Sequence, residues 1–167
     1  MTYRSLTLFL SFVLTNYSSA VDLDKRESLL IEANYGEVNE RSGYTTYRGE
    51  VSIVQGSLQI LADEVQIKTK ENGDIIEVTA TSNQGLSKPA RIEKISSSIE
   101  KLQATAQEIK YLVEKQQVKL TGNAFVQKNN DEFMGELVYY DIKLGVVKIG
   151  KGEKSTGRVK IKYGKTD

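Results

Sequence analysis

The sequence contains no cysteine and no histidine, and these two absences remove most common catalytic chemistries. Without cysteine there is no disulfide framework, no thiol nucleophile and no thiolate metal site. Without histidine the commonest general base and the commonest metal ligand are missing. Two pairs of adjacent carboxylates occur, Asp63-Glu64 and Asp131-Glu132. Adjacent strand residues point to opposite faces, so neither pair can act on one substrate as an acid/base couple. We therefore expect no enzyme, no catalytic residue, no metal and no cofactor.

An excess of charge of one sign is also lacking. The chain has 23 Lys and Arg against 22 Asp and Glu, and without the first twenty residues, which include Arg4, the two signs balance. This balance predicts no nucleic-acid partner. The one basic stretch is the C-terminal tail, which we interpret as a solvated edge strand protected by lysines. Its basic residues are Lys148, Lys151, Lys154, Arg158, Lys160, Lys162 and Lys165.

Long hydrophobic runs are few, and the clearest one is at the N-terminus. Arg4 precedes the apolar residues 6–14, and the small residues 18–20 (SSA) follow them. This order is typical of a cleavable signal peptide, and the run is well short of the roughly 20 residues needed to span a bilayer. We therefore expect a signal peptide at 1–20 and a soluble, exported single domain at 21–167.

The clearest structural pattern in the remaining chain is a β-hairpin over residues 47–67. Apolar and polar residues alternate on both sides of the turn-type residues 55–57 (QGS), which is the period of half-buried strands. After the turn, the alternation shifts by one residue before it resumes at Val65. Further alternating segments with Gly-containing turns predict an all-β fold.

This hairpin has a second copy 73 positions later, at residues 120–142. The offset pairs residues of similar size and polarity, and we interpret it as an internal duplication. Among the matched pairs are Tyr47 with Leu120, Gly49 with Gly122, Ile53 with Val126, and Val65 with Val138.

The duplication also decides an ambiguity over residues 92–113. Apolar residues recur there at threes and fours, which taken alone favours an amphipathic helix. The same offset places residues 104–121 over 31–48, a segment with Gly36, Gly43 and several β-branched or aromatic residues that is typical of strands. Because both copies should share one conformation, we predict strands in both.

Three motifs, at 49–65 (GEVSIVQGSLQILADEV), 86–92 (LSKPARI) and 120–127 (LTGNAFVQ), resemble the OstA-like family. The similarity extends from about Leu29 to Tyr163. It implies a half-open antiparallel β-jellyroll of two splayed sheets and a periplasmic protein of lipopolysaccharide transport. The implied ligand is lipopolysaccharide, its lipid A acyl chains held in an apolar groove. The implied partners are the inner-membrane-anchored and outer-membrane components of the pathway, together with further copies of the chain stacked head to tail.

Matching to the family predicts five groove residues, Leu29, Ile31, Ile92, Tyr111 and Val113. The first and last alternating segments, 29–33 and 158–163, should form the free edges of the sheets, where assembly would involve Ile31, Ala33, Lys160 and Ile161. Each groove residue could equally be a packed core residue, because core and groove share one face. Two alternatives remain: a structural β-scaffold filled by its own side chains, and a related membrane-anchored component of the pathway that does not itself hold lipid.

Overall fold

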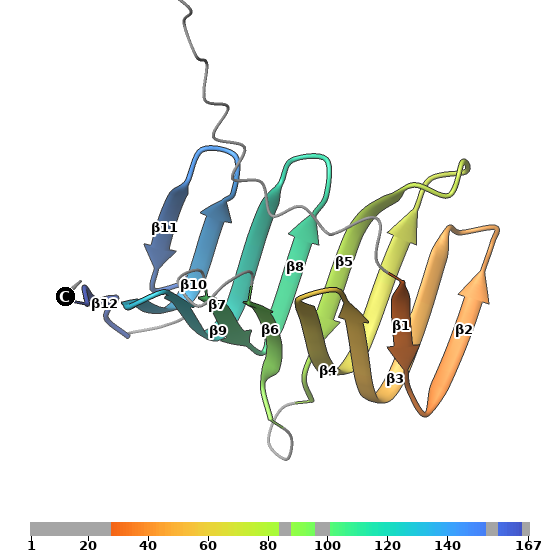
Figure 1. Cartoon of the computed structure of the whole chain (residues 1–167), viewed down its shortest axis with the longest axis horizontal. Coiled ribbons are helices and arrows are strands. Elements are labelled where there is room, and N and C mark those ends of the chain that lie inside the picture. Colours follow the sequence, from red (N-terminus) through yellow and green to blue (C-terminus); the bar gives the residue numbers. More distant parts are fainter. Residues whose placement is uncertain (1–27, 84–87, 96–100, 153–156, 165–167) are drawn as a thin grey trace, which may run out of the picture.

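A computed structural model describes residues 28–83, 88–95, 101–152 and 157–164, so the predicted signal peptide at 1–20 lies outside the described residues (Figure 1). The described residues form twelve strands joined in antiparallel pairs. No helix long and apolar enough to cross a membrane occurs among them. The strands are β1 (Leu29–Glu32), β2 (Tyr35–Asn39), β3 (Tyr44–Gln55), β4 (Leu58–Thr69), β5 (Ile75–Thr81), β6 (Ala90–Ile95), β7 (Lys101–Ala106), β8 (Glu108–Leu112), β9 (Gln117–Lys128), β10 (Asp131–Asp141), β11 (Val146–Gly150) and β12 (Lys160–Lys162).

The strands are arranged in two layers that share their four longest members, β3, β4, β9 and β10. One half of each long strand pairs within the first layer, in the order β1-β3-β4-β6-β7-β9-β10-β12. The other half pairs within the second layer, in the order β2-β3-β4-β5-β8-β9-β10-β11. In Figure 1 β1 and β2 lie at one end of the long axis, and β11 and β12 lie at the other. This is the predicted half-open β-jellyroll.

The long strands pass between the layers at sharp local bends. Gly49 and Glu50 in β3 both have positive φ, at 79° and 49°, and Gly122 and Asn123 in β9 repeat this at 81° and 49°. The β3–β4 register shifts at the first bend, between Arg48 and Val51. Such irregularities are bulges that bend a strand and re-aim its side chains. In the sequence, the shift of the apolar–polar alternation before Val65 marks the same passage of the long strands from one layer to the other.

The predicted duplication is confirmed by the strand bounds of the matched segments. Adding 73 to the bounds of β2 and β3 gives the bounds of β8 and β9. The corner bonds repeat too: the Asn34 amide donates to the Gly49 carbonyl at 3.0 Å, and the Gln107 amide donates to the Gly122 carbonyl at 3.0 Å. The prediction of strands rather than a helix is likewise confirmed, since β6, β7 and β8 occupy most of residues 92–113.

The core lies between the two layers and contains small aliphatic residues. The largest fully buried side chains are Ile109, Leu120, Val51, Val65 and Val138. Burial of a side chain of this kind contributes about 1.5–3 kcal/mol. Several alanines of both repeats, including Ala80, Ala104 and Ala124, complete the cluster.

Replacing Gly122 by alanine tests the bend. A Cβ there would meet Oε1 of Gln107 at 2.3 Å and its Cβ at 2.8 Å, in addition to the strain of φ +81°. We expect Gly122→Ala to lower the free energy of unfolding by about 1–3 kcal/mol in urea denaturation. Gly150→Ala is the control, because its Cβ would meet nothing nearer than 4.0 Å. Equal stability of the two variants would contradict the role of the bend.

Candidate functional site

An apolar cavity of about 100 Å³ lies between the layers. It is lined from β4 through β10, and among the described residues Lys94 is the only charged one in its wall. The lining residues are Leu58, Ile60, Val78, Ala80, Ile92, Lys94, Leu102, Ala104, Ile109, Tyr111, Val118, Leu120, Val126, Tyr140 and Ile142.

The cavity sits where the two repeats meet. In the second layer β5 of the first repeat pairs with β8 of the second, which places Val78 opposite Tyr111. In the first layer β6 pairs with β7, which places Ile92 opposite Ala104. Directly opposed residues of paired strands lie on the same face of a sheet. The strand alternation therefore turns an apolar row from each layer inward.

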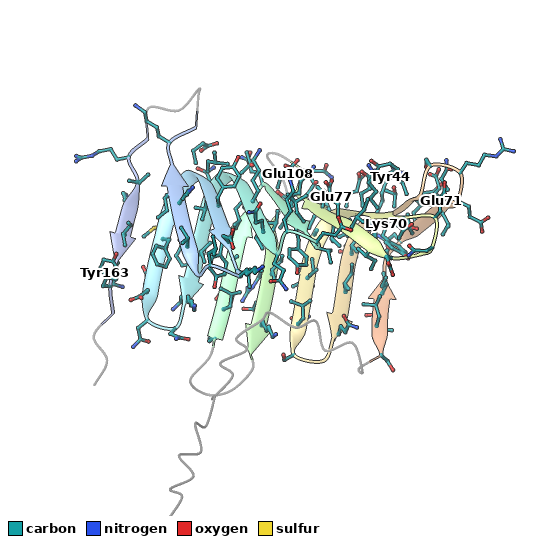
Figure 2. All side chains as sticks on the ribbon, turned by 90° about the horizontal axis from the view of Figure 1, so that it is seen from above. Tyr44, Lys70, Glu71, Glu77, Glu108 and Tyr163 are labelled. Atoms are coloured by element: carbon teal, nitrogen blue, oxygen red, sulfur yellow. The ribbon has the colours of Figure 1, made fainter. Side chains whose placement is uncertain are left out.

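The outward rows of the same strands are charged. The Lys110 Nζ lies 2.9 Å from Oε1 of Glu77, and this hydrogen bond is the largest cause that raises the pKa of Lys110 above its ordinary value. Figure 2 labels Glu77 of β5 and Glu108 of β8, which the register places at opposite ends of this strand pair. The described residues include no group of three or more His, Cys, Asp or Glu side chains that could hold a metal ion. The arrangement separates an apolar interior from a charged exterior.

The structure places two of the five predicted groove residues, Ile92 and Tyr111, in the wall of this cavity. The other three lie elsewhere. Leu29 is 48% exposed on β1, and Ile31 is half-buried against the core. Val113 follows β8, and its amide donates to the carbonyl of Ile76 at 3.1 Å.

The predicted edge residues lie at the two ends of the molecule. Among the described residues β1 pairs only with β3, and β12 pairs only with β10, so each has one side without a neighbour. Ile31 belongs to β1, and Lys160 and Ile161 belong to β12. Ala33 lies just beyond the last residue of β1.

Several wall residues escaped the sequence analysis, among them Ala80, Ala104 and Val118. The alternation of β5 carried a usable signal, because Val78 and Ala80 share a face. In β6 to β8 the connections interrupt the alternation, so the inward face of each short strand could not be assigned from the previous one.

Comparison with known proteins gives consistent matches over most of the chain. Residues 30–146 match the family model described as LptA/(LptD N-terminal domain) LPS transport protein. The lipopolysaccharide export system protein LptH of Pseudomonas aeruginosa is 30% identical over 137 residues, which cover 81% of this chain and 75% of that protein. The lipopolysaccharide export system protein LptA of Escherichia coli K12 is 27% identical over 124 residues, 74% of this chain and 65% of that protein.

A solved structure matches the fold as well. The crystal structure of LptH, described as the LptA homologous periplasmic component of the conserved lipopolysaccharide transport device from Pseudomonas aeruginosa, is similar with a TM-score of 0.70 and 26% identity. The match covers 84% of this chain and 98% of that one.

A charge placed in the cavity wall should weaken binding of an apolar ligand. We expect Tyr111→Asp to reduce the affinity for a fluorescent long-chain amphiphile at least about tenfold, because the carboxylate would be desolvated without a partner. Tyr139→Asp is the matched control, because Tyr139 lies outside the cavity wall and is 44% exposed. Circular dichroism would establish that both variants are folded. Unchanged binding by folded Tyr111→Asp would contradict a ligand in this cavity.

Proposed function

This chain belongs to the LptA/LptD N-terminal domain family of lipopolysaccharide transport proteins, and from that membership we propose that it is a periplasmic lipopolysaccharide carrier. It binds the lipid A acyl chains between its layers and passes the molecule from the inner-membrane export complex toward the outer-membrane translocon. This role is transport without catalysis.

The apolar interior is the observation that carries the proposal. A wall with one charged residue offers acyl chains a dry surface, and each buried CH₂ contributes about 0.8 kcal/mol. The sugars and phosphates of the ligand would remain in water outside the layers.

The small size of the cavity limits how much of an acyl chain it can enclose. At about 100 Å³ it is smaller than the roughly 150 Å³ apolar cavity that accommodates benzene. Several acyl chains therefore require the layers to separate, or they remain partly exposed. Both outcomes suit a carrier, because a fully enclosed lipid could not be passed on.

The small cavity also gives the scaffold alternative its basis, since a structural protein would fill its interior with its own side chains. Photo-crosslinking in cells separates the two. A photoreactive amino acid at position 111 should capture lipopolysaccharide, and the same group at position 139 should not. Crosslinks from position 139 alone would contradict the carrier proposal.

The free edges support the proposed bridge of stacked subunits. An unpaired strand presents main-chain donors and acceptors to another chain, and a second copy can add to it by strand pairing. In the proposed bridge, β12 of one copy adds to β1 of the next. The membrane components of the pathway would occupy the terminal edges.

A proline in the last strand should block this stacking. Proline lacks the backbone N–H and disrupts pairing of β12, so Ile161→Pro should reduce the average mass measured by light scattering while amphiphile binding is retained. Ile161→Val is the control, because it keeps the N–H and a β-branched apolar side chain. Wild-type protein that stays monomeric at high concentration would refute stacking. A proline variant that assembles like wild type would show that β12 is not the edge used.

A further inference from the structure

The strands at each end of the molecule correspond, by repeat, to the strands on one side of the internal junction between the repeats. The N-terminal end strands β1 and β2 correspond to β7 and β8 at the offset of 73. The C-terminal end strands β11 and β12 correspond to β5 and β6 at an offset of 69, when strands are matched through their partners on β4 and β10. Inside the molecule, β5 pairs with β8 and β6 pairs with β7.

We propose that a second copy of this chain docks by reproducing the internal junction in both layers, with a fixed register and two complementary charge pairs. The inference rests on the proposed end-to-end assembly. It adds that β11 pairs with β2 of the next copy as β12 pairs with β1, and that charge sets the polarity of the stack.

The inward positions of the transferred register are all apolar. Val78 opposite Tyr111 becomes Val147 opposite Val38 of the next copy. Ile92 opposite Ala104 becomes Ile161 opposite Ile31 of the next copy. Val38 is 69% exposed and Ile161 is 47% exposed in the single molecule, so docking would bury both. The apolar interior would then continue from one copy into the next.

The outward positions of the transferred register bring opposite charges together. Thr79 opposite Lys110 becomes Lys148 opposite Glu37 of the next copy. Arg91 opposite Thr105 becomes Lys160 opposite Glu32 of the next copy. Directly opposed residues of unlike charge stabilise a strand pair, and like charges destabilise it.

The charged residues within the end strands have one sign at each end of the molecule. Strands β1 and β2 contain Glu32 and Glu37 and no Lys or Arg. Strands β11 and β12 contain Lys148, Lys160 and Lys162 and no Asp or Glu. Two like ends would repel each other, which favours head-to-tail over head-to-head contacts. The lysines disfavour pairing of the C-terminal edge with most other strands, but they allow it to pair with an edge that carries acidic residues.

Exposed apolar residues also gather at these ends. Twelve large apolar side chains are exposed in the described part of the chain, and eight of them lie on or beside the four end strands. Clustered exposed apolar surface of this kind marks protein interaction sites. The eight are Leu29, Leu30, Tyr35, Val38, Val146, Val159, Ile161 and Tyr163. Figure 2 shows Tyr163 at the end of the molecule opposite to Tyr44 and Glu71.

Charge reversal tests the polarity. One variant carries Glu32→Lys with Glu37→Lys, and a second carries Lys148→Glu with Lys160→Glu. We expect each alone to self-associate at least about tenfold more weakly than wild type in sedimentation without lipid, because like charges then face each other at the junction. An equimolar mixture should regain wild-type association, because each end of one variant then complements an end of the other. A mixture that associates no better than its components would overturn the charge pairing.

Cysteine crosslinking tests the register, and the absence of native cysteine makes it unambiguous. A chain with Lys160→Cys mixed with a chain with Glu32→Cys should form a disulfide-linked heterodimer. A mixture of Lys162→Cys with Glu32→Cys, two residues out of register, should form less. Equal or greater yield from the second mixture would overturn the register.

Amphiphile binding by the wild-type protein is measured separately. If the wild-type protein binds no amphiphile, lipid carriage is refuted, and the charge and register results are unaffected. Restored association by the mixture together with crosslinking at positions 160 and 32 would support the junction whatever the ligand.

Discussion

The architecture depends on one backbone constraint, the change of direction of a long strand as it passes from one layer to the other. At Gly49-Glu50 and again at Gly122-Asn123, two consecutive residues take positive φ. Each bend is closed by a main-chain bond to Asn34 or Gln107, at the corner between two short strands. The layers are therefore joined along one margin by shared strands. Separation of the layers at the opposite margin would break none of the strand pairings in the described part of the chain, which is what makes the jellyroll half-open.

This arrangement connects the packing to the proposed function. The inward rows of both layers are apolar and include several alanines, so the layers approach closely and leave a cavity of about 100 Å³. Opening the free margin would expose apolar surface to water, at roughly 25 cal/mol for each Å². Acyl chains that cover the same surface remove that cost. A ligand of this kind would therefore stabilise the separated layers.

Much of the fold could be predicted from the sequence, because the duplication supplied what local pattern could not. The helix-like spacing over residues 92–113 was overruled by its match to a strand-like segment, and the structure has β6, β7 and β8 there. The residues that line the groove were harder to predict from the sequence. Ile92 and Tyr111 line the cavity, whereas Leu29 lies on an end strand. Tyr111 and Val38 occupy the same position in the two repeats, yet Val38 is exposed because, among the described residues, β2 pairs only with β3. The sequence indicated the position of a residue within its repeat, but it did not indicate whether a neighbouring strand covers that position.

The most direct test of the account is methyl NMR of the protein titrated with lipid A. Inward methyl groups, such as those of Ile92, Val118 and Leu120, should shift and show nuclear Overhauser contacts to acyl-chain protons. The methyl groups of Leu61 and Leu144, which are exposed and outside the cavity wall, should stay unchanged. Contacts confined to the exposed methyl groups, with the inward resonances unmoved, would contradict the claim that the bent layers enclose the lipid-binding site.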